Sequence, residues 1–267
     1  MGVFGLAIGA GVYPTLSRLL QSKDPKPGFD LLSAAVKRVI VLALITQAIL
    51  SSAGSDIASV IYGDRLWSHE HIINYTFPYV KLNSQADEVG LALGIMSLGL
   101  WAWASNTVIA RGFYALGNTW MPTLLGSIVT LCAFPLYGFL AFDLGIGLVG
   151  LALTSTLAIS SYTILLILAL KWKYKMGLDN FLVFWFKISF ATWMGAAGGF
   201  LLRQEVLHPA ISQVNLGEGI AYPLVLGGIT GTIAAVLTIG LGVVMGVSEI
   251  REVSAKISTK VLQKLRR

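Results

Sequence analysis

The 19 lysine and arginine residues of this chain are gathered in clusters between long, uncharged apolar runs. The clusters alternate along the sequence between rich and poor in positive charge. This alternation is typical of proteins that cross a membrane several times, because their cytoplasmic loops carry an excess of lysine and arginine. The distribution of charge therefore constrains the fold more than any single motif, and it predicts an all-α polytopic membrane protein.

Composition points to the same class. Apolar residues make up 55% of the chain and charged residues 12%, with a mean hydropathy of +0.76. A typical soluble domain is about 25% charged. One crossing of a bilayer needs about 20 apolar residues. We expect about seven transmembrane helices, from the uncharged runs at 1–17, 39–55, 89–110, 112–142, 144–170, 188–202 and 219–248.

Local sequence refines two of these helices. Turn residues at 116–119, followed by Pro122, predict a tight turn and move the start of the fourth helix to about Met121. The second helix is predicted to continue past Asp56 to about Tyr62. Asp56 is then expected near the membrane interface or facing other parts of the protein.

The topology follows from the position of the basic residues. Sixteen of the 19 lie after the first, third and fifth runs and in the C-terminal tail, whereas Arg65, Lys81 and Arg203 follow the second and sixth runs. Because cytoplasmic loops are rich in lysine and arginine, this count predicts a cytoplasmic C-terminus and an external N-terminus.

The tail has a pattern of its own. Apolar residues repeat every four positions from Val253 to Leu265, and Lys256, Lys260 and Lys264 form the neighbouring row. This arrangement predicts an amphipathic helix whose lysines anchor it to the anionic cytoplasmic leaflet.

Glycines mark the last two predicted spans. Gly195 and Gly199, and likewise Gly227 and Gly231, are separated by three residues. Small residues at this spacing predict close contact between membrane helices.

Two motifs resemble those of a known family. Residues 5–18, GLAIGAGVYPTLSR, follow the pattern G-x-A-x-G-x-x-x-x-P-x-L-S-R, and residues 111–122, RGFYALGNTWMP, follow R-x-F-Y-A-L-G-D/N-T-x-x-P. The chain thereby resembles the MurJ/MviN family of lipid II flippases, in the multidrug/oligosaccharidyl-lipid/polysaccharide exporter superfamily. The resemblance covers residues 5 to about 170 by motif and continues by helix count, which implies helices 8 to 14 of a 14-helix protein.

The resemblance also implies an organisation and a function. Residues 1–170 are expected to form lobe helices, 171–247 two additional transmembrane helices, and 248–267 the basic cytoplasmic tail. The implied function is the movement of lipid-linked peptidoglycan precursor across the bacterial cytoplasmic membrane, within a longer or two-part transporter. Three alternatives remain open: an exporter of another lipid-linked oligosaccharide or polysaccharide, a non-transporting scaffold subunit, and an inactive fragment.

Four residues are candidates for the substrate pathway. Arg111 could meet an anionic head group or anchor its helix end by snorkelling. Asn118, with Thr119, could cap the following helix or contact a coupling ion. Thr154 and Ser155 could supply ligands or form interhelical hydrogen bonds.

Other classes find little support in the sequence. The single cysteine excludes a disulfide framework and a zinc pattern, and His69 and His71 lie at a spacing that does not share a helix face. The sequence has no phosphate-binding glycine-rich loop that would indicate an ATPase. Some relatives hold a cation with an Asn/Asp pair that residues 131–137 lack. We expect no enzymatic activity, no cofactor, no metal and no nucleic-acid partner; the expected partners are the lipid-linked precursor and membrane lipids.

Overall fold

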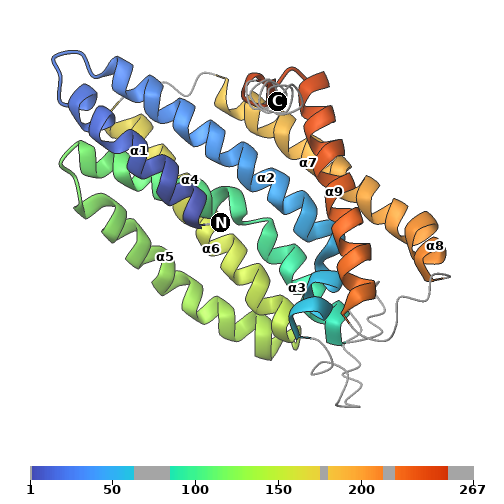
Figure 1. Cartoon of the computed structure of the whole chain (residues 1–267). Helices are drawn as coiled ribbons and strands as arrows, with labels where there is room; N and C mark the ends of the chain where they lie inside the picture. The colour runs from blue at the N-terminus through green and yellow to red at the C-terminus, as the bar shows by residue number, and fades with distance from the viewer. Residues whose placement is uncertain (1, 63–84, 175–179, 213–219, 252–267) are drawn as a thin grey trace, which may run out of the picture.

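The computed structural model describes residues 2–62, 85–174, 180–212 and 220–251 (Figure 1). Within these ranges the backbone is helical almost throughout and has no strand, which confirms the all-α prediction. Helices suit such apolar runs because each backbone N–H and C=O finds its partner within the segment. The elements are α1 (Gly2–Leu20), α2 (Lys26–Tyr62), α3 (Gln85–Ser97), α4 (Leu100–Ala115), α5 (Trp120–Gly138), the π-helical turn η2 (Phe139–Asp143), α6 (Gly147–Tyr174), α7 (Phe181–Leu202), the π-helical turn η3 (Arg203–Leu207), α8 (His208–Ser212) and α9 (Ala221–Val244).

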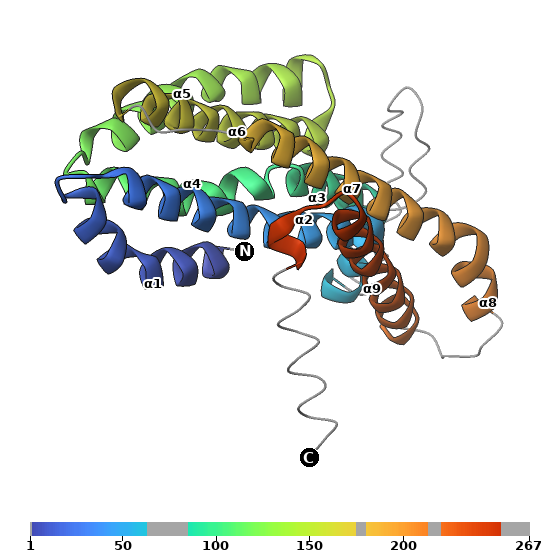
Figure 2. The ribbon, with the colours of Figure 1, turned by 90° about the horizontal axis from the view of Figure 1, so that it is seen from above.

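The helix α2 is at the centre of the array. It packs against α1, α3, α4, α7 and α9, and α5 and α9 lie on opposite sides of the molecule in both views (Figures 1 and 2). Leu32, Val39 and Ile40 on α2 are fully buried. Asp56, near its far end, is 4% exposed, which confirms that this carboxylate faces protein.

Within the described ranges, five helical segments are long and apolar enough to cross a membrane: Glu88–Ala115, Trp120–Asp143, Gly147–Tyr174, Phe181–Ser212 and Ala221–Val244. They coincide with the third to seventh predicted spans. The first two predicted runs also lie in helices, α1 and α2, but these are not among the five. Seven crossings therefore remain a prediction.

The predicted turn at 116–119 is confirmed. Gly117 has a φ of 72°, and its N–H donates to the carbonyl of Tyr114 at 3.0 Å. The N–H of Asn118 donates to the carbonyl of Phe113 at 2.9 Å. This pair of bonds is the Schellman motif, in which a glycine in the left-handed region ends a helix. The next helix, α5, begins at Trp120, one residue before the predicted start.

The third span contains a break that the sequence did not predict. Between α3 and α4 the N–H groups of Leu98 and Gly99 bond three residues back, to Ile95 and Met96. Such tighter bonding leaves carbonyls without their usual helical partners. Thr156 of α6 donates a hydrogen bond to the carbonyl of Ile95 at 2.9 Å. Further along α6, a second threonine donates a hydrogen bond to a backbone carbonyl of α4. Side chains of α6 therefore stabilise the break.

The glycine pairs of the last two helices serve different contacts. A Cβ on Gly199 of α7 would lie 2.9 Å from the Cβ of Ala234 on α9. On α9, a Cβ on Gly227 would lie 2.7 Å from the Cβ of Asp56, and one on Gly231 would lie 2.9 Å from Cγ2 of Ile49. The predicted close contacts are confirmed: α7 uses its glycines against α9, and α9 uses its own against α2.

Candidate functional site: a polar groove along α5

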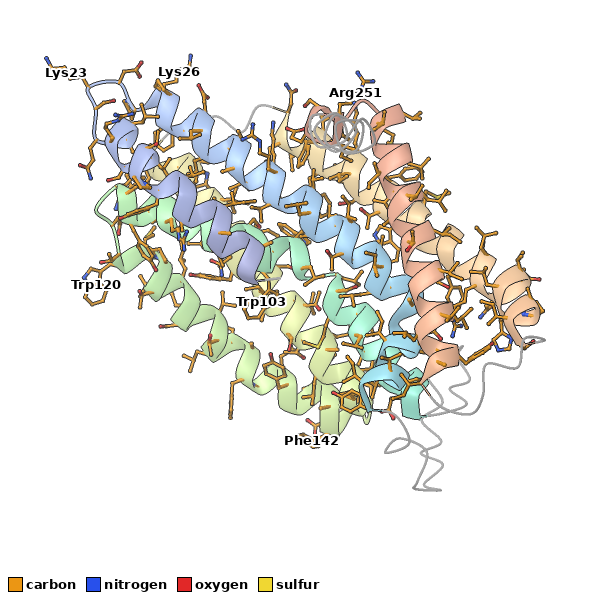
Figure 3. All side chains as sticks on the ribbon, in the orientation of Figure 1. Lys23, Lys26, Trp103, Trp120, Phe142 and Arg251 are labelled. Carbon is orange, nitrogen blue, oxygen red and sulfur yellow. The ribbon has the colours of Figure 1, made fainter. Side chains whose placement is uncertain are left out.

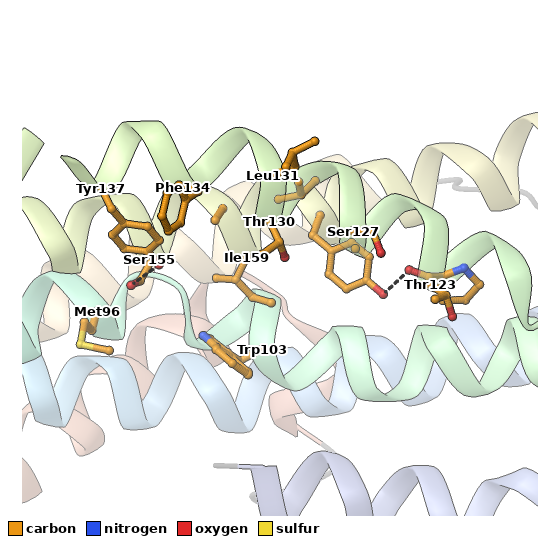
Figure 4. A pocket seen from close by; sticks show the side chains of 15 residues that line it. Met96, Trp103, Thr123, Ser127, Thr130, Leu131, Phe134, Tyr137, Ser155 and Ile159 are labelled. Carbon is orange, nitrogen blue, oxygen red and sulfur yellow. Dashed lines mark hydrogen bonds between the residues drawn. The ribbon is translucent and has the colours of Figure 1, made fainter. Parts of the chain in front are cut away.

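An open groove of about 830 Å³ runs between α5 and the helices α3, α4 and α6 (Figure 4). On α5 it is lined by the hydroxyl groups of Thr123, Ser127, Thr130 and Tyr137. Residues spaced by three, four or seven positions lie on one face of a helix. The otherwise apolar helix α5 therefore presents one stripe of hydroxyl groups to the groove.

Hydrogen bonds tie both ends of the groove to α6. Tyr162 donates to the carbonyl of Pro122 at 3.0 Å, and the hydroxyl groups of Tyr137 and Ser155 lie 2.9 Å apart. From Thr123 to Tyr137 the helical rise of 1.5 Å per residue amounts to about 21 Å. A hydrocarbon core is about 30 Å thick, so the groove covers most of the depth of a bilayer.

The two hydroxyl groups in the middle of the stripe are available for other partners. Ser127 and Thr130 are exposed, and their hydroxyl groups make no hydrogen bond to any other residue that the structure describes. A hydroxyl without a partner is costly in hydrocarbon. These two side chains are therefore suited to a groove that holds water or a polar molecule.

Apart from these hydroxyl groups and those of α6, the described lining of the groove is mainly apolar. Trp103 is 54% exposed and Phe134 is 79% exposed, and Met96 and Leu131 are also among the lining residues (Figure 4). No lysine, arginine, aspartate or glutamate is among the lining residues that the structure describes. Hydroxyl groups beside large apolar side chains match an amphiphilic molecule better than a bare ion.

The structure separates the neighbouring candidates Thr154 and Ser155. Ser155 lines the groove, where its hydroxyl meets Tyr137. Thr154 is fully buried and donates to the carbonyl of Gly150 on its own helix at 2.9 Å. Ser155 therefore belongs to the groove, and Thr154 lies outside it.

The candidate Asn118 has a structural role at the start of α5. Its Oδ1 accepts a hydrogen bond from the N–H of Met121 at 3.2 Å, as a cap of α5. Its Nδ2 donates to the hydroxyl of Tyr174 on α6 at 3.0 Å. Thr119 forms no such cap bond. Of the two residues expected to cap α5, Asn118 does so.

Arg111 connects the two sequence motifs. It lies on α4 against α1, where a Cβ added to Gly9 would come within 2.5 Å of its Nη1 atom. One turn away, Thr107 of α4 lies against Gly5 of α1 in the same way. Glycine at both positions makes room for these longer side chains. The motifs at 5–18 and 111–122 thus pack on each other, and Arg111 does not line the groove.

The family model described as "Lipid II flippase MurJ" matches residues 1–216. The chain belongs to the MurJ lipid II flippase family. This family consists of flippases and not of catalytic enzymes. Because it belongs to this family and its described part has several helices apolar enough to cross a bilayer, the chain is a multi-pass inner-membrane protein. No curated protein matches the chain.

A buried ion pair is the main feature of this MurJ-family chain that sequence reasoning missed. Arg203, at the start of η3, donates from Nε to Oδ2 of Asp56 and from Nη2 to Oδ1, each at 2.7 Å. The two side chains are 16% and 6% exposed. The charge pattern identifies Arg203 only as a basic residue that follows the sixth apolar run. The available signal was a lone acidic residue and a lone basic residue near the ends of two apolar runs.

Some candidates lie outside the residues that the structure describes. These are Lys256, Lys260 and Lys264 of the predicted tail helix and the segment 69–71 with its two histidines. Among the described residues, no group of histidine, cysteine, aspartate and glutamate could hold a metal ion.

Proposed function

We propose that this chain forms one lobe of a transporter that moves lipid II, the lipid-linked peptidoglycan precursor, across the cytoplasmic membrane. The groove along α5 is its part of the substrate pathway. The observation that carries this proposal is an uncharged, amphiphilic groove, open along most of a transmembrane helix, in a member of the flippase family. In the proposed arrangement, the chain corresponds to helices 8 to 14 and works with a second lobe.

The lining indicates which part of the substrate the groove meets. Hydroxyl groups and aromatic rings suit the sugars and peptide of the head group, whereas a lining whose described residues are all uncharged does not suit its diphosphate. We therefore assign the diphosphate to groups outside this groove. Rocking of two lobes around such a site would expose it alternately to each side.

The proposed orientation has the N-terminus outside and the C-terminus in the cytoplasm. In support, Lys23 and Lys26, after α1, lie at the same end of the helices as Arg251, after α9, and Phe142 lies at the opposite end (Figure 3). We also propose that the chain divides into parts at residues 170 and 247. In support, α7 and α9, the helices of the middle part, pack on α2, away from the groove.

The first test fills the groove. Replacing Ser127 by tryptophan is expected to reduce lipid II translocation about tenfold or more, because the indole occupies the volume that the substrate requires. The measurement is lipid II translocation in vesicles containing the complete transporter. The matched control is Ile128→Trp, since Ile128 is 47% exposed on α5 and does not line the groove.

Equal transport by both tryptophan variants, or equal loss in both, would exclude the groove as the pathway. Competition in the same vesicles separates the remaining alternatives. Another lipid-linked oligosaccharide that competes better than lipid II would identify a different exporter. Translocation that continues without the chain would indicate a scaffold or an inactive fragment.

A further inference from the structure

A second pocket, of about 350 Å³, lies where α2, the start of α7 and the segment after α9 meet. Its size is within the range of small-molecule sites. Lys37 of α2, Lys187 of α7 and Glu249 are in its lining. Glu249 is two residues before Arg251, at the end of the molecule that carries the basic clusters (Figure 3). The pocket is therefore expected at the level of the lipid head groups.

Two lysine ammonium groups line this pocket and can form further hydrogen bonds. The Nζ of Lys37 lies 3.9 Å from Oε1 of Glu249 and 5.6 Å from the ring centre of Phe184. A distance of 3.9 Å is too long for a hydrogen bond. Lys187 has no ion-pair partner in the described part of the chain. Each ammonium has three donors, so the pair can bind a phosphate group together.

Acceptors in the same pocket restrict the type of anion. The carboxylate of Glu249 is 15% exposed and accepts a hydrogen bond from Ser248 at 2.9 Å. A carboxylate repels a bare phosphate but accepts hydrogen bonds from hydroxyl groups. Asn180 adds an amide at the start of α7. A ligand with both a phosphate and hydroxyl groups fits this set better than a phosphate alone.

The neighbouring surface favours a lipid over a soluble molecule. Leu182, Phe186 and Phe190 are 68%, 64% and 57% exposed and repeat every four residues along α7. Residues at this spacing form a continuous ridge on one side of a helix. The ridge begins next to the pocket, so acyl chains can lie along α7 while the head group is bound.

We propose that the pocket binds an anionic phospholipid of the phosphatidylglycerol type. Its phosphodiester lies between Lys37 and Lys187, and its glycerol hydroxyl groups point toward Glu249 and Asn180. Basic pockets between helices on the cytoplasmic side of a membrane are suited to such head groups. This site is separate from the groove along α5, since the two share no lining residue.

The test is a binding titration of the full chain in detergent with phosphatidylglycerol, followed by native mass spectrometry. The double variant K37Q/K187Q is expected to bind about twenty-fivefold more weakly, because each lysine near a lipid head group contributes about fivefold. The matched control is K171Q/K173Q, which removes two exposed lysines at the end of α6, outside the pocket. K187Q alone is expected to lose about fivefold, which keeps the test valid if the double variant does not fold.

Competing lipids and ions define the ligand. Phosphatidylethanolamine and inorganic phosphate are expected not to displace phosphatidylglycerol, and E249Q is expected to reduce the preference for phosphatidylglycerol over phosphatidic acid. An equal loss in K171Q/K173Q would overturn the proposal, because the effect would then be general surface charge. Displacement by inorganic phosphate or by lipid II would also overturn it, in favour of a free-anion site or a substrate site.

Discussion

Replacing Arg203 by glutamine is expected to lower the free energy of unfolding by about 3–5 kcal/mol, because the carboxylate of Asp56 would be left buried without its partner. Asp56 is 4% exposed and is bound by two hydrogen bonds of 2.7 Å from Arg203. The measurement is the unfolding of the purified chain in detergent micelles. The opposite variant, D56N, is expected to destabilise the chain because the guanidinium of Arg203 loses its bond to this carboxylate.

The neighbouring Glu205 supplies the control. It is exposed on η3, the turn that carries Arg203, so E205Q removes a charge without opening a buried site. Its expected effect is within about 0.5 kcal/mol. The double variant D56L/R203M should be more stable than either single variant, because apolar replacement of both partners removes the desolvation cost. An R203Q protein as stable as the wild type would contradict this account.

The ion pair has a structural consequence for the whole array. Asp56 is near the end of α2, Arg203 follows α7, and Gly227 of α9 covers Asp56. Three helices thus meet at one polar contact among apolar neighbours. The planar carboxylate and guanidinium bind each other through two hydrogen bonds. This geometry fixes the position of α7 along α2. A purely apolar contact would specify that register less strictly.

The sequence was sufficient to predict the helices and one of the connections between them. Long uncharged runs located the helices, since each run had to satisfy its own backbone in lipid. The turn before α5 was predictable because glycine and proline at 117 and 122 act locally. The break at Leu98 and Gly99 was not, because a single glycine in an apolar run does not end a membrane helix. One carbonyl at the break, that of Ile95, accepts a hydrogen bond from a threonine of α6, a helix distant in sequence.

Only part of the candidate site was predicted from the sequence, and the reason is related. Ser155 and Thr154 are equivalent in chemistry, but successive residues of a helix point about 100° apart, so one of them can line the groove while the other is buried. The rotation of α6 that decides between them depends on its packing against α3 and α5. The partner of Asp56 was hidden in the same way, because Arg203 approaches it only when α2 and α7 lie side by side.

Replacing Gly90 by alanine is expected to destabilise the chain by about 1–3 kcal/mol, because the added methyl group would collide with backbone that cannot rotate away. A Cβ at this position of α3 would lie 2.5 Å from the backbone nitrogen of Ser55 on α2, and one at Gly54 would lie 2.7 Å from the carbonyl oxygen of Gly90. The measurement is again unfolding in detergent micelles. The control is Gly94→Ala, one turn along α3.

At Gly94 the nearest atom to an added Cβ is the Cα of Ser51, at 4.0 Å, which is ordinary contact. Alanine there also gains helix propensity over glycine, worth about 1 kcal/mol in a soluble helix, so G94A is expected to be neutral or stabilising. The two variants make the same chemical change on the same helix and differ in the distance to α2. Opposite signs would show that the close crossing of α2 and α3 is a packing requirement of this lobe. Equal effects would show instead that α3 responds to helix propensity alone.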